Sequence, residues 1–349
     1  MTEGYLVLED GQCFEGCLTW STSEAVTGEV VFTTGMTGYC ESLTDPSYEG
    51  QILVFTYPLQ GNYGVSPPDK WESHRVHAAG VVLGEACEDW SHSEGIRSLV
   101  DWLTEQNVPV LSGVDTRQVT KVLREAGVML GGLSSSAQPM LRSQDPNAMD
   151  LVARVTSPIK EQHPNPGKPK VVVVDCGMKA NILRSLKQYP IEMEVVPYDH
   201  DYTNDPFDGI FISNGPGDPA RCATTIDILK AAMKKQKPTY GICLGAQLMA
   251  LAAGASTYKL RYGHRGHNQP CLDTQTQRCY ITSQNHGYAI KESSLPVGWC
   301  VSFRNLNDGT VEGIRHHELP FHAVQFHPEA APGPTDTLWF FEQFAESLR

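Results

Sequence analysis

The stretch from Pro238 to Gly254 constrains the fold of this chain more than any other. A lysine-rich helical run ends just before it, and small and apolar residues recur at helical spacing after it, which predicts a strand, a sharp turn and a helix. Gly241 and Gly245 suit a tight elbow, where neighbouring atoms crowd the backbone. Cys243 then lies at the turn, where unpaired helix amides and the helix dipole favour thiolate over thiol. This is the form of a nucleophile elbow with cysteine in place of serine, although a lone cysteine in an apolar run is also typical of an inert core.

The residues around this elbow predict an α/β domain. Val171 to Asp175 is a continuous run dominated by valine, typical of a strand buried on both faces. Helices are expected at 181–189 and 223–235, and further strands at 194–196 and 209–213. This alternation predicts a doubly wound, mostly parallel sheet, whose ligands collect at the carboxyl ends of the strands. Residues 175–177, 213–219 and Cys243 all fall there.

The length of 349 residues favours two domains. In residues 1–155 we expect a smaller, β-rich α+β domain. Its strands are predicted at 5–8, 12–16, 28–33 and 51–57, a loop at 35–48, and helices at 96–106 and from Asp115 to Gly127. Residues 156–169 contain prolines without periodicity and are predicted to be an interdomain linker, so the second domain comprises residues 170–349.

Composition excludes several classes of function. The net charge of −13 and the absence of a basic stripe argue against nucleic acid or an anionic membrane as a partner. No apolar run is long enough to cross a bilayer, and the start of the chain has no features of a targeting segment, so we expect a cytosolic protein. The ten cysteines form no C-x-x-C pair, which argues against a zinc site and a disulfide framework. We therefore expect no metal and mostly reduced, structural thiols.

A cysteine nucleophile needs a base, and the base needs a group that orients it. Among the twelve histidines, His327 is the best candidate, because it follows a strand-like run and Glu329 comes two residues later. The glycine-rich loop after the strand at 209–213 is either a plain turn or part of an oxyanion hole. In the second case the amides of Gly215 and Leu244 would donate to the oxyanion.

These motifs resemble those of a known family. Gly241 to Gly245, Ser213 to Pro219, Gln284 to Tyr288 and His327 to Glu329 are together similar to the motifs of class I, triad-type glutamine amidotransferases. The first domain narrows the resemblance to the small subunit, or amino-terminal glutaminase region, of carbamoyl phosphate synthetase. The segments that carry this similarity are 35–39, 43–48, 56–58 and 61–64.

The resemblance implies hydrolysis of L-glutamine to glutamate and ammonia. Cys243 would form the γ-glutamyl thioester, His327 would act as base and acid, and Glu329 would orient His327. The oxyanion hole would be Gly215 and Leu244. The residues that would hold glutamine are Ser47, Gly215, Gly217, Leu244, Gln247, Asn285, Gly287 and Tyr288.

The family also implies a partner. Ammonia would pass through a tunnel to a carbamoyl phosphate synthetase large subunit, or to fused synthetase domains, for pyrimidine or arginine biosynthesis. ATP and Mg²⁺ would be used by that partner, and this chain would need no cofactor of its own. One position departs from the family pattern, because Ala246 stands where histidine usually follows Gly-Ile-Cys-Leu-Gly.

Two alternatives stay open at this point. The chain would be an amidotransferase for another synthetase, or a γ-glutamyl hydrolase, if the first domain were misleading. It would be a weakly catalytic or non-catalytic scaffold if it mainly supported a synthetase that uses free ammonia. The presence of Cys243, His327 and Glu329 favours catalysis.

Overall fold

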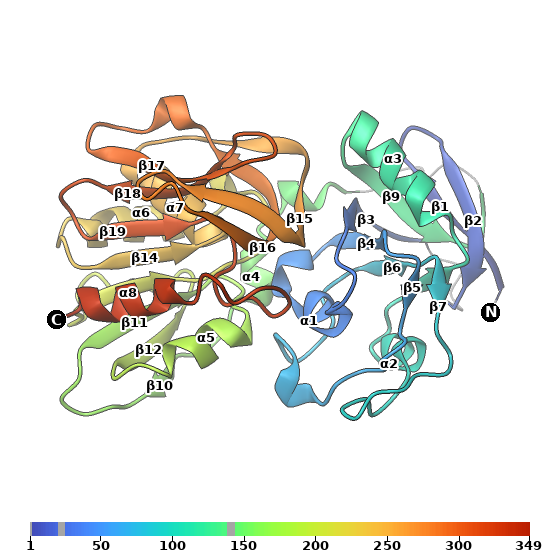
Figure 1. Cartoon of the computed structure of the whole chain (residues 1–349), viewed down its shortest axis with the longest axis horizontal. Helices are drawn as coiled ribbons and strands as arrows, with labels where there is room; N and C mark the ends of the chain where they lie inside the picture. Colours follow the sequence, from blue (N-terminus) through green and yellow to red (C-terminus); the bar gives the residue numbers. More distant parts are fainter. Residues whose placement is uncertain (1, 20–24, 138–143) are drawn as a thin grey trace. The chain divides into compact units, whose positions relative to one another are not determined.

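A computed structural model describes residues 2–19, 25–137 and 144–349, and the chain divides into two units, Met1–Met149 and Asp150–Arg349 (Figure 1). Residues 156–169, the expected linker, therefore lie within the second unit. They are not free of structure, because β10 (Glu161–His163) pairs antiparallel with β12 (Glu192–Pro197). A segment that contains prolines can still form a short edge strand, because an edge strand makes hydrogen bonds on one side only.

The first unit is built on a closed barrel. The order of its strands is β1 (Thr2–Leu8), β2 (Cys13–Leu18), β8 (Val110–Ser112), β6 (Gly80–Val82), β4 (Gln51–Phe55), β3 (Val26–Thr33) and β9 (Met129–Ser134), and β9 pairs again with β1. The short strands β5 (Leu59–Gln60) and β7 (Glu85–Ala86) form a separate pair. The predicted strands are confirmed. Their closure into a barrel was not predicted from the sequence.

The helices of the first unit are α1 (Tyr39–Thr44), α2 (Leu99–Glu105) and α3 (Thr116–Ala126). The predicted start of α3 is confirmed, because the Asp115 side chain accepts a hydrogen bond from the Gln118 amide. The expectation of a loop over 35–48 is wrong at α1. The polar neighbours obscured a short apolar face there, on which Tyr39, Cys40 and Leu43 are buried.

The second unit contains a ten-stranded sheet (Figure 1). Its parallel half has the order β12, β11 (Lys170–Asp175), β13 (Gly209–Ile212), β14 (Thr239–Ile242) and β19 (Phe321–Val324). At one edge β10 pairs with β12. The other strands are β18 (Val311–His316), β16 (Cys279–Ile290), β15 (Thr257–Asp273) and β17 (Trp299–Asn305). The pairings of all five strands are antiparallel. The sheet is thus mixed, not mostly parallel as predicted. Short connections such as that between β15 and β16 allow only antiparallel neighbours, whereas parallel neighbours need long crossovers.

Helices cover both faces of the parallel half, as a doubly wound sheet requires. Val172 and Val174 of β11 pack in one core cluster with residues of α6 (Ala223–Met233) and α7 (Leu244–Ala253). Val171 and Val173 pack in the other cluster with residues of α5 (Ala180–Leu186) and α8 (Trp339–Ser347). The valine run is buried on both faces for this reason, as predicted. A short helix, α4 (Val152–Val155), precedes the sheet.

Among the helices of the described residues, none has the length and apolar character that crossing a membrane requires.

Candidate active site

The elbow between β14 and α7 places Cys243 at a strained turn. Cys243 has φ 54° and ψ −105°, a backbone conformation that residues other than glycine rarely adopt. The two glycines of the motif are needed for steric reasons. A Cβ atom on Gly241 would lie 2.7 Å from the carbonyl of Gly245, and one on Gly245 would lie 2.4 Å from the Ile212 oxygen. The predicted strand, turn and helix are confirmed, with α7 beginning directly after the cysteine.

His327 and Glu329 form the predicted pair. The Nδ1 atom of His327 lies 2.6 Å from Oε1 of Glu329, and both side chains are buried. Burial disfavours the charged imidazole, but the Glu329 carboxylate and the Cys243 thiol outweigh it and raise the pKa of His327. The Nε2 atom makes no hydrogen bond within the described structure, so it is the nitrogen left for proton exchange. The Glu329 carboxylate therefore favours the protonated imidazole of His327.

Lys179 is a site residue that sequence reasoning missed. Its Nζ atom lies 3.0 Å from Oε1 of Glu329 and also donates to the Ala330 carbonyl, and the lysine side chain is buried. Burial opposes the charged form of Glu329, but Lys179 and His327 together lower the pKa of this carboxyl. The available signal was a lysine four residues after the end of the valine run of β11, at the edge of the sheet where ligands collect.

The two predicted oxyanion-hole residues lie side by side. A Cβ atom on Gly215 would be 2.1 Å from the Cys176 oxygen and 2.7 Å from Cδ2 of Leu244. Leu244 is the first residue of α7, where an amide has no acceptor within the helix. Gly217 follows with φ 85°, a conformation that favours glycine. Gly215 and Leu244 are thus neighbours, and their role as converging amide donors stays a prediction.

Strand β16 passes Cys243 and carries three predicted glutamine-binding residues. The sulfur of Cys243 lies 3.6 Å from the main-chain oxygen of Asn285. Gln247, on α7, donates from Nε2 to the main-chain oxygen of Tyr288 at 2.9 Å. Gly287 lies between these two contacts on the same strand. Helix α7 and strand β16 thus bring Gln247 and residues 285–288 close to Cys243.

Two residues singled out in the sequence need separate comment. Ser47 belongs to the first unit, in a turn where its amide donates to the Asp45 carboxylate at 2.9 Å; its role in glutamine binding stays a prediction. Ala246 is fully buried in the core of the second unit, and its amide donates to the Cys243 oxygen at 3.0 Å. The position that departs from the family pattern is therefore a core position in the first turn of α7.

One cluster of the described residues has the side chains to hold a metal ion. His264, His286 and Glu312 offer ligand atoms that all lie within 4.8 Å of one another, and all three residues are buried. His264, however, contacts Glu312 through Nδ1 at 3.0 Å and Asp308 through Nε2 at 2.8 Å. Burial opposes its charge, but these two carboxylates raise its pKa to about 9. A cationic His264 balances the carboxylates, so we interpret the cluster as an ion-pair network between β15 and β18.

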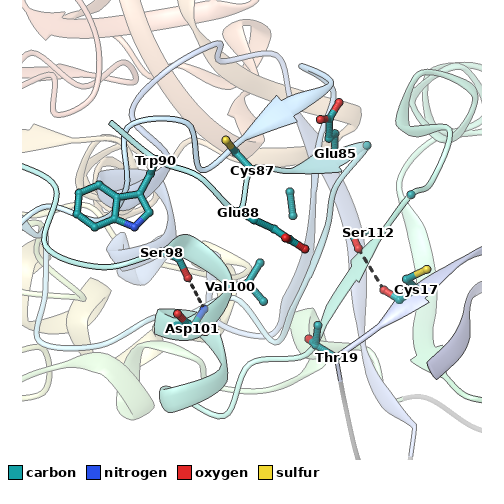
Figure 2. A pocket seen from close by; sticks show the side chains of 13 residues that line it. Cys17, Thr19, Glu85, Cys87, Glu88, Trp90, Ser98, Val100, Asp101 and Ser112 are labelled. Atoms are coloured by element: carbon teal, nitrogen blue, oxygen red, sulfur yellow. Dashed lines mark hydrogen bonds between the residues drawn. The ribbon is translucent and has the colours of Figure 1, made fainter. Parts of the chain in front are cut away.

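The first unit contains a pocket of about 580 Å³. Figure 2 shows the Trp90 ring on one side and the carboxylates of Glu85, Glu88 and Asp101 around the space. None of the predicted site residues is among those that line it. The pocket and the cysteine site therefore share no residue.

Comparison with known proteins identifies the class to which this site belongs. Residues 172–347 match the family model described as glutamine amidotransferase class-I. The second unit, with its elbow cysteine and buried His-Glu pair, is thus a class I glutamine amidotransferase domain. Residues 6–133 match the model of the carbamoyl-phosphate synthase small chain, CPSase domain.

Full-length relatives agree with both matches. The chain is 46% identical over 359 residues to the carbamoyl phosphate synthase arginine-specific small chain of Aspergillus oryzae, covering 98% of this chain and 79% of that protein. It is 50% identical over 359 residues to the multifunctional protein CAD of Squalus acanthias, covering 99% of this chain and 16% of that protein. The multifunctional protein URA2 of Saccharomyces cerevisiae is 44% identical over 386 residues, with 99% and 17% covered. The chain belongs to the family of carbamoyl phosphate synthase small chains, and it spans about a sixth of the length of these multifunctional relatives.

Proposed function

We propose that this chain hydrolyses L-glutamine to glutamate and ammonia, and that it supplies the ammonia to a carbamoyl phosphate synthetase. The observation that carries the proposal is a thiol on a strained elbow at the start of α7, beside a buried His327–Glu329 pair joined at 2.6 Å. Strain of this kind persists where the surrounding structure enforces it, and it is often found at catalytic groups. The family membership supports the same reaction.

In the proposed reaction Cys243 is the nucleophile and His327 transfers the protons. The thiolate of Cys243 attacks the side-chain amide carbon of glutamine, and the resulting oxyanion is held by the amides of Gly215 and Leu244. The carbon–nitrogen bond then breaks, and His327 gives its proton to the departing nitrogen, which leaves as ammonia. A water molecule attacks the thioester while His327 takes one of its protons, so that glutamate leaves and the thiolate returns. Glu329 orients the ring of His327 in both of its protonation states, and Lys179 contacts Glu329.

Glutamine is held, in this proposal, by polar groups from three places in the second unit and one in the first. The residues are Ser47, Gly215, Gly217, Leu244, Gln247, Asn285, Gly287 and Tyr288. A pocket rich in fixed donors and acceptors suits an amide substrate, because an analogue that lacks those groups leaves them unpaired.

The partner is a carbamoyl phosphate synthetase, either a separate large subunit or fused domains. The small-chain relative supports the first arrangement and the multifunctional relatives support the second. ATP and Mg²⁺ are used by that partner, and this chain brings no cofactor of its own. The ammonia serves pyrimidine or arginine biosynthesis, and the identities of 50% and 46% to the two kinds of relative do not separate these pathways.

The test is glutamate release from L-glutamine by the purified chain, followed by glutamine-dependent carbamoyl phosphate formation with the synthetase added. Cys243→Ala should abolish both. Cys222→Ala is the matched control, because it removes another buried thiol and should leave both unchanged. Glutamine-dependent synthesis that survives in Cys243→Ala would reject the cysteine mechanism and favour the scaffold alternative.

A further inference from the structure

Two buried side-chain amides lie next to the proposed glutamine site. Gln247 is on α7, and Gln325 follows β19 two residues before His327; the first is 3% exposed and the second fully buried. The Nε2 atom of Gln247 donates to Oε1 of Gln325 at 3.0 Å and to the main-chain oxygen of Tyr288 at 2.9 Å. A primary amide has two N–H groups, so both donors of Gln247 are used inside the protein.

The orientation of this pair follows from the main chain. The Tyr288 oxygen is a carbonyl that can only accept, and it also contacts Nδ1 of His286 at 2.8 Å. Gln247 must therefore turn its nitrogen toward Tyr288, because the reverse orientation would bring two oxygens together. Gln325 must in turn offer its oxygen to the second N–H group of Gln247. The assignment of nitrogen and oxygen in both amides is fixed by this chain of contacts.

The remaining polar atom of Gln247 is its oxygen. Oε1 accepts no hydrogen bond from any residue in the described parts of the chain. An oxygen in this position selects a donor, and the strongest donor on a free amino acid is the α-ammonium group, because charge-assisted hydrogen bonds exceed neutral ones. Gln247 is thus prepared to bind an N–H group of the substrate and not an acceptor.

We propose that Gln325 is a positioning residue, which locks the Gln247 amide so that its oxygen faces the N–H donor of the substrate. The inference rests on the proposed glutamine hydrolysis. Tyr288 alone would leave the amide free to turn about a single hydrogen bond, whereas a second acceptor fixes its plane. The main chain of Gln325 is fixed, because its main-chain N–H donates to the main-chain oxygen of Glu312 at 2.8 Å.

A second observation distinguishes this role from a structural one. The Nε2 atom of Gln325 is buried and has no hydrogen-bond partner within the described structure. An unpaired buried donor destabilises the folded state, so a residue chosen for stability alone would be apolar here. Methionine at this position removes both the unpaired donor and the acceptor for Gln247. Stability should then stay level or rise while substrate binding weakens.

The test is a double-mutant cycle with Gln325→Met, Gln247→Met and the double variant, measured by glutamate release. In Gln325→Met the KM for glutamine should rise about tenfold, the loss expected for one misplaced hydrogen bond, with kcat changed less than about twofold. The double variant should be no worse than Gln247→Met, because Gln325 acts only through Gln247. Gln60→Met, which replaces a buried glutamine of the first unit, is the control and should change neither parameter.

Additive effects in the cycle would overturn the inference, and so would an unchanged KM in Gln325→Met. If the parent chain releases no glutamate even with the synthetase added, the proposed function fails and the inference is judged by hydrogen exchange instead. The Gln247 side-chain amide signals, assigned by their loss in Gln247→Met, should exchange faster in Gln325→Met than in the parent chain. Equal exchange rates would overturn the inference without reference to turnover.

Discussion

Replacing Lys179 with methionine should lower both the stability of the second unit and the rate of glutamate release. Lys179 and Glu329 form an ion pair at 3.0 Å, and their side chains are 3% and 0% exposed. The substitution keeps the apolar stem of the side chain. Among the described residues it leaves His327 as the one charged partner of the buried Glu329 carboxylate. The variant therefore tests whether the proposed base His327 and the carboxylate of Glu329 depend on this lysine.

The expected cost is large because a buried charge is left without compensation. Removing one partner of a buried ion pair typically costs about 3 to 5 kcal/mol. For a unit of this size each kcal/mol lowers Tm by roughly 2 to 4 °C, so Tm should fall by about 6 to 20 °C. Glutamate release should fall at least about tenfold. A displaced carboxylate stabilises the protonated His327 less well, and a rise of about 1.4 kcal/mol in the activation free energy already slows the reaction tenfold.

The pH dependence gives the sign of the effect. The pKa of Glu329 is held below its ordinary value of 4.5, mainly by Lys179 and His327 against the effect of burial. The stability from this charge is therefore complete above pH 4.5 and is lost as the pH falls below it. The difference in unfolding free energy between the parent chain and Lys179→Met should be largest near neutral pH and shrink in acid.

The assay combines thermal and urea unfolding with glutamate release. Lys230→Met is the matched control, because it removes one exposed lysine and should leave both readouts unchanged. The double variant Lys179→Met/Glu329→Gln removes both charges, so it should regain part of the stability but none of the activity. The reasoning is refuted if Lys179→Met unfolds like the control, or if its stability deficit is the same at pH 7 and pH 3.

Two further predictions concern the second unit. Because the pKa of His264 is raised to about 9, its ion pairs are complete below pH 6.5 and are lost as the pH rises through about 9. The urea midpoint of the parent chain should therefore decline over this range and that of His264→Gln should decline less; an equal decline in both would contradict the ion-pair interpretation. Gly245→Ala should destabilise the unit by about 1 to 3 kcal/mol, because its Cβ atom would lie 2.4 Å from the Ile212 main-chain oxygen, and calorimetry showing unchanged stability would reject that steric account.

The sequence by itself determined the local features of this protein. The glycines around Cys243 predicted the elbow, because only a tight turn needs residues without a Cβ atom on both sides of a nucleophile. The valine run predicted the strand buried on both faces, and the spacing of His327 and Glu329 predicted their pairing. Each of these depends on residues close together in the chain.

The tertiary structure decided what depends on distant residues. Lys179 reaches Glu329 across 150 positions of sequence, and Gln247 reaches Gln325 across 78. The antiparallel half of the sheet and the closure of the barrel likewise depend on which strands become neighbours. Local spacing carries no information about such contacts, because folding brings those side chains together through the packing of whole elements. Cys243 and the His327–Glu329 pair could therefore be predicted from the sequence, whereas the buried charges and amides around them are found only in the tertiary structure.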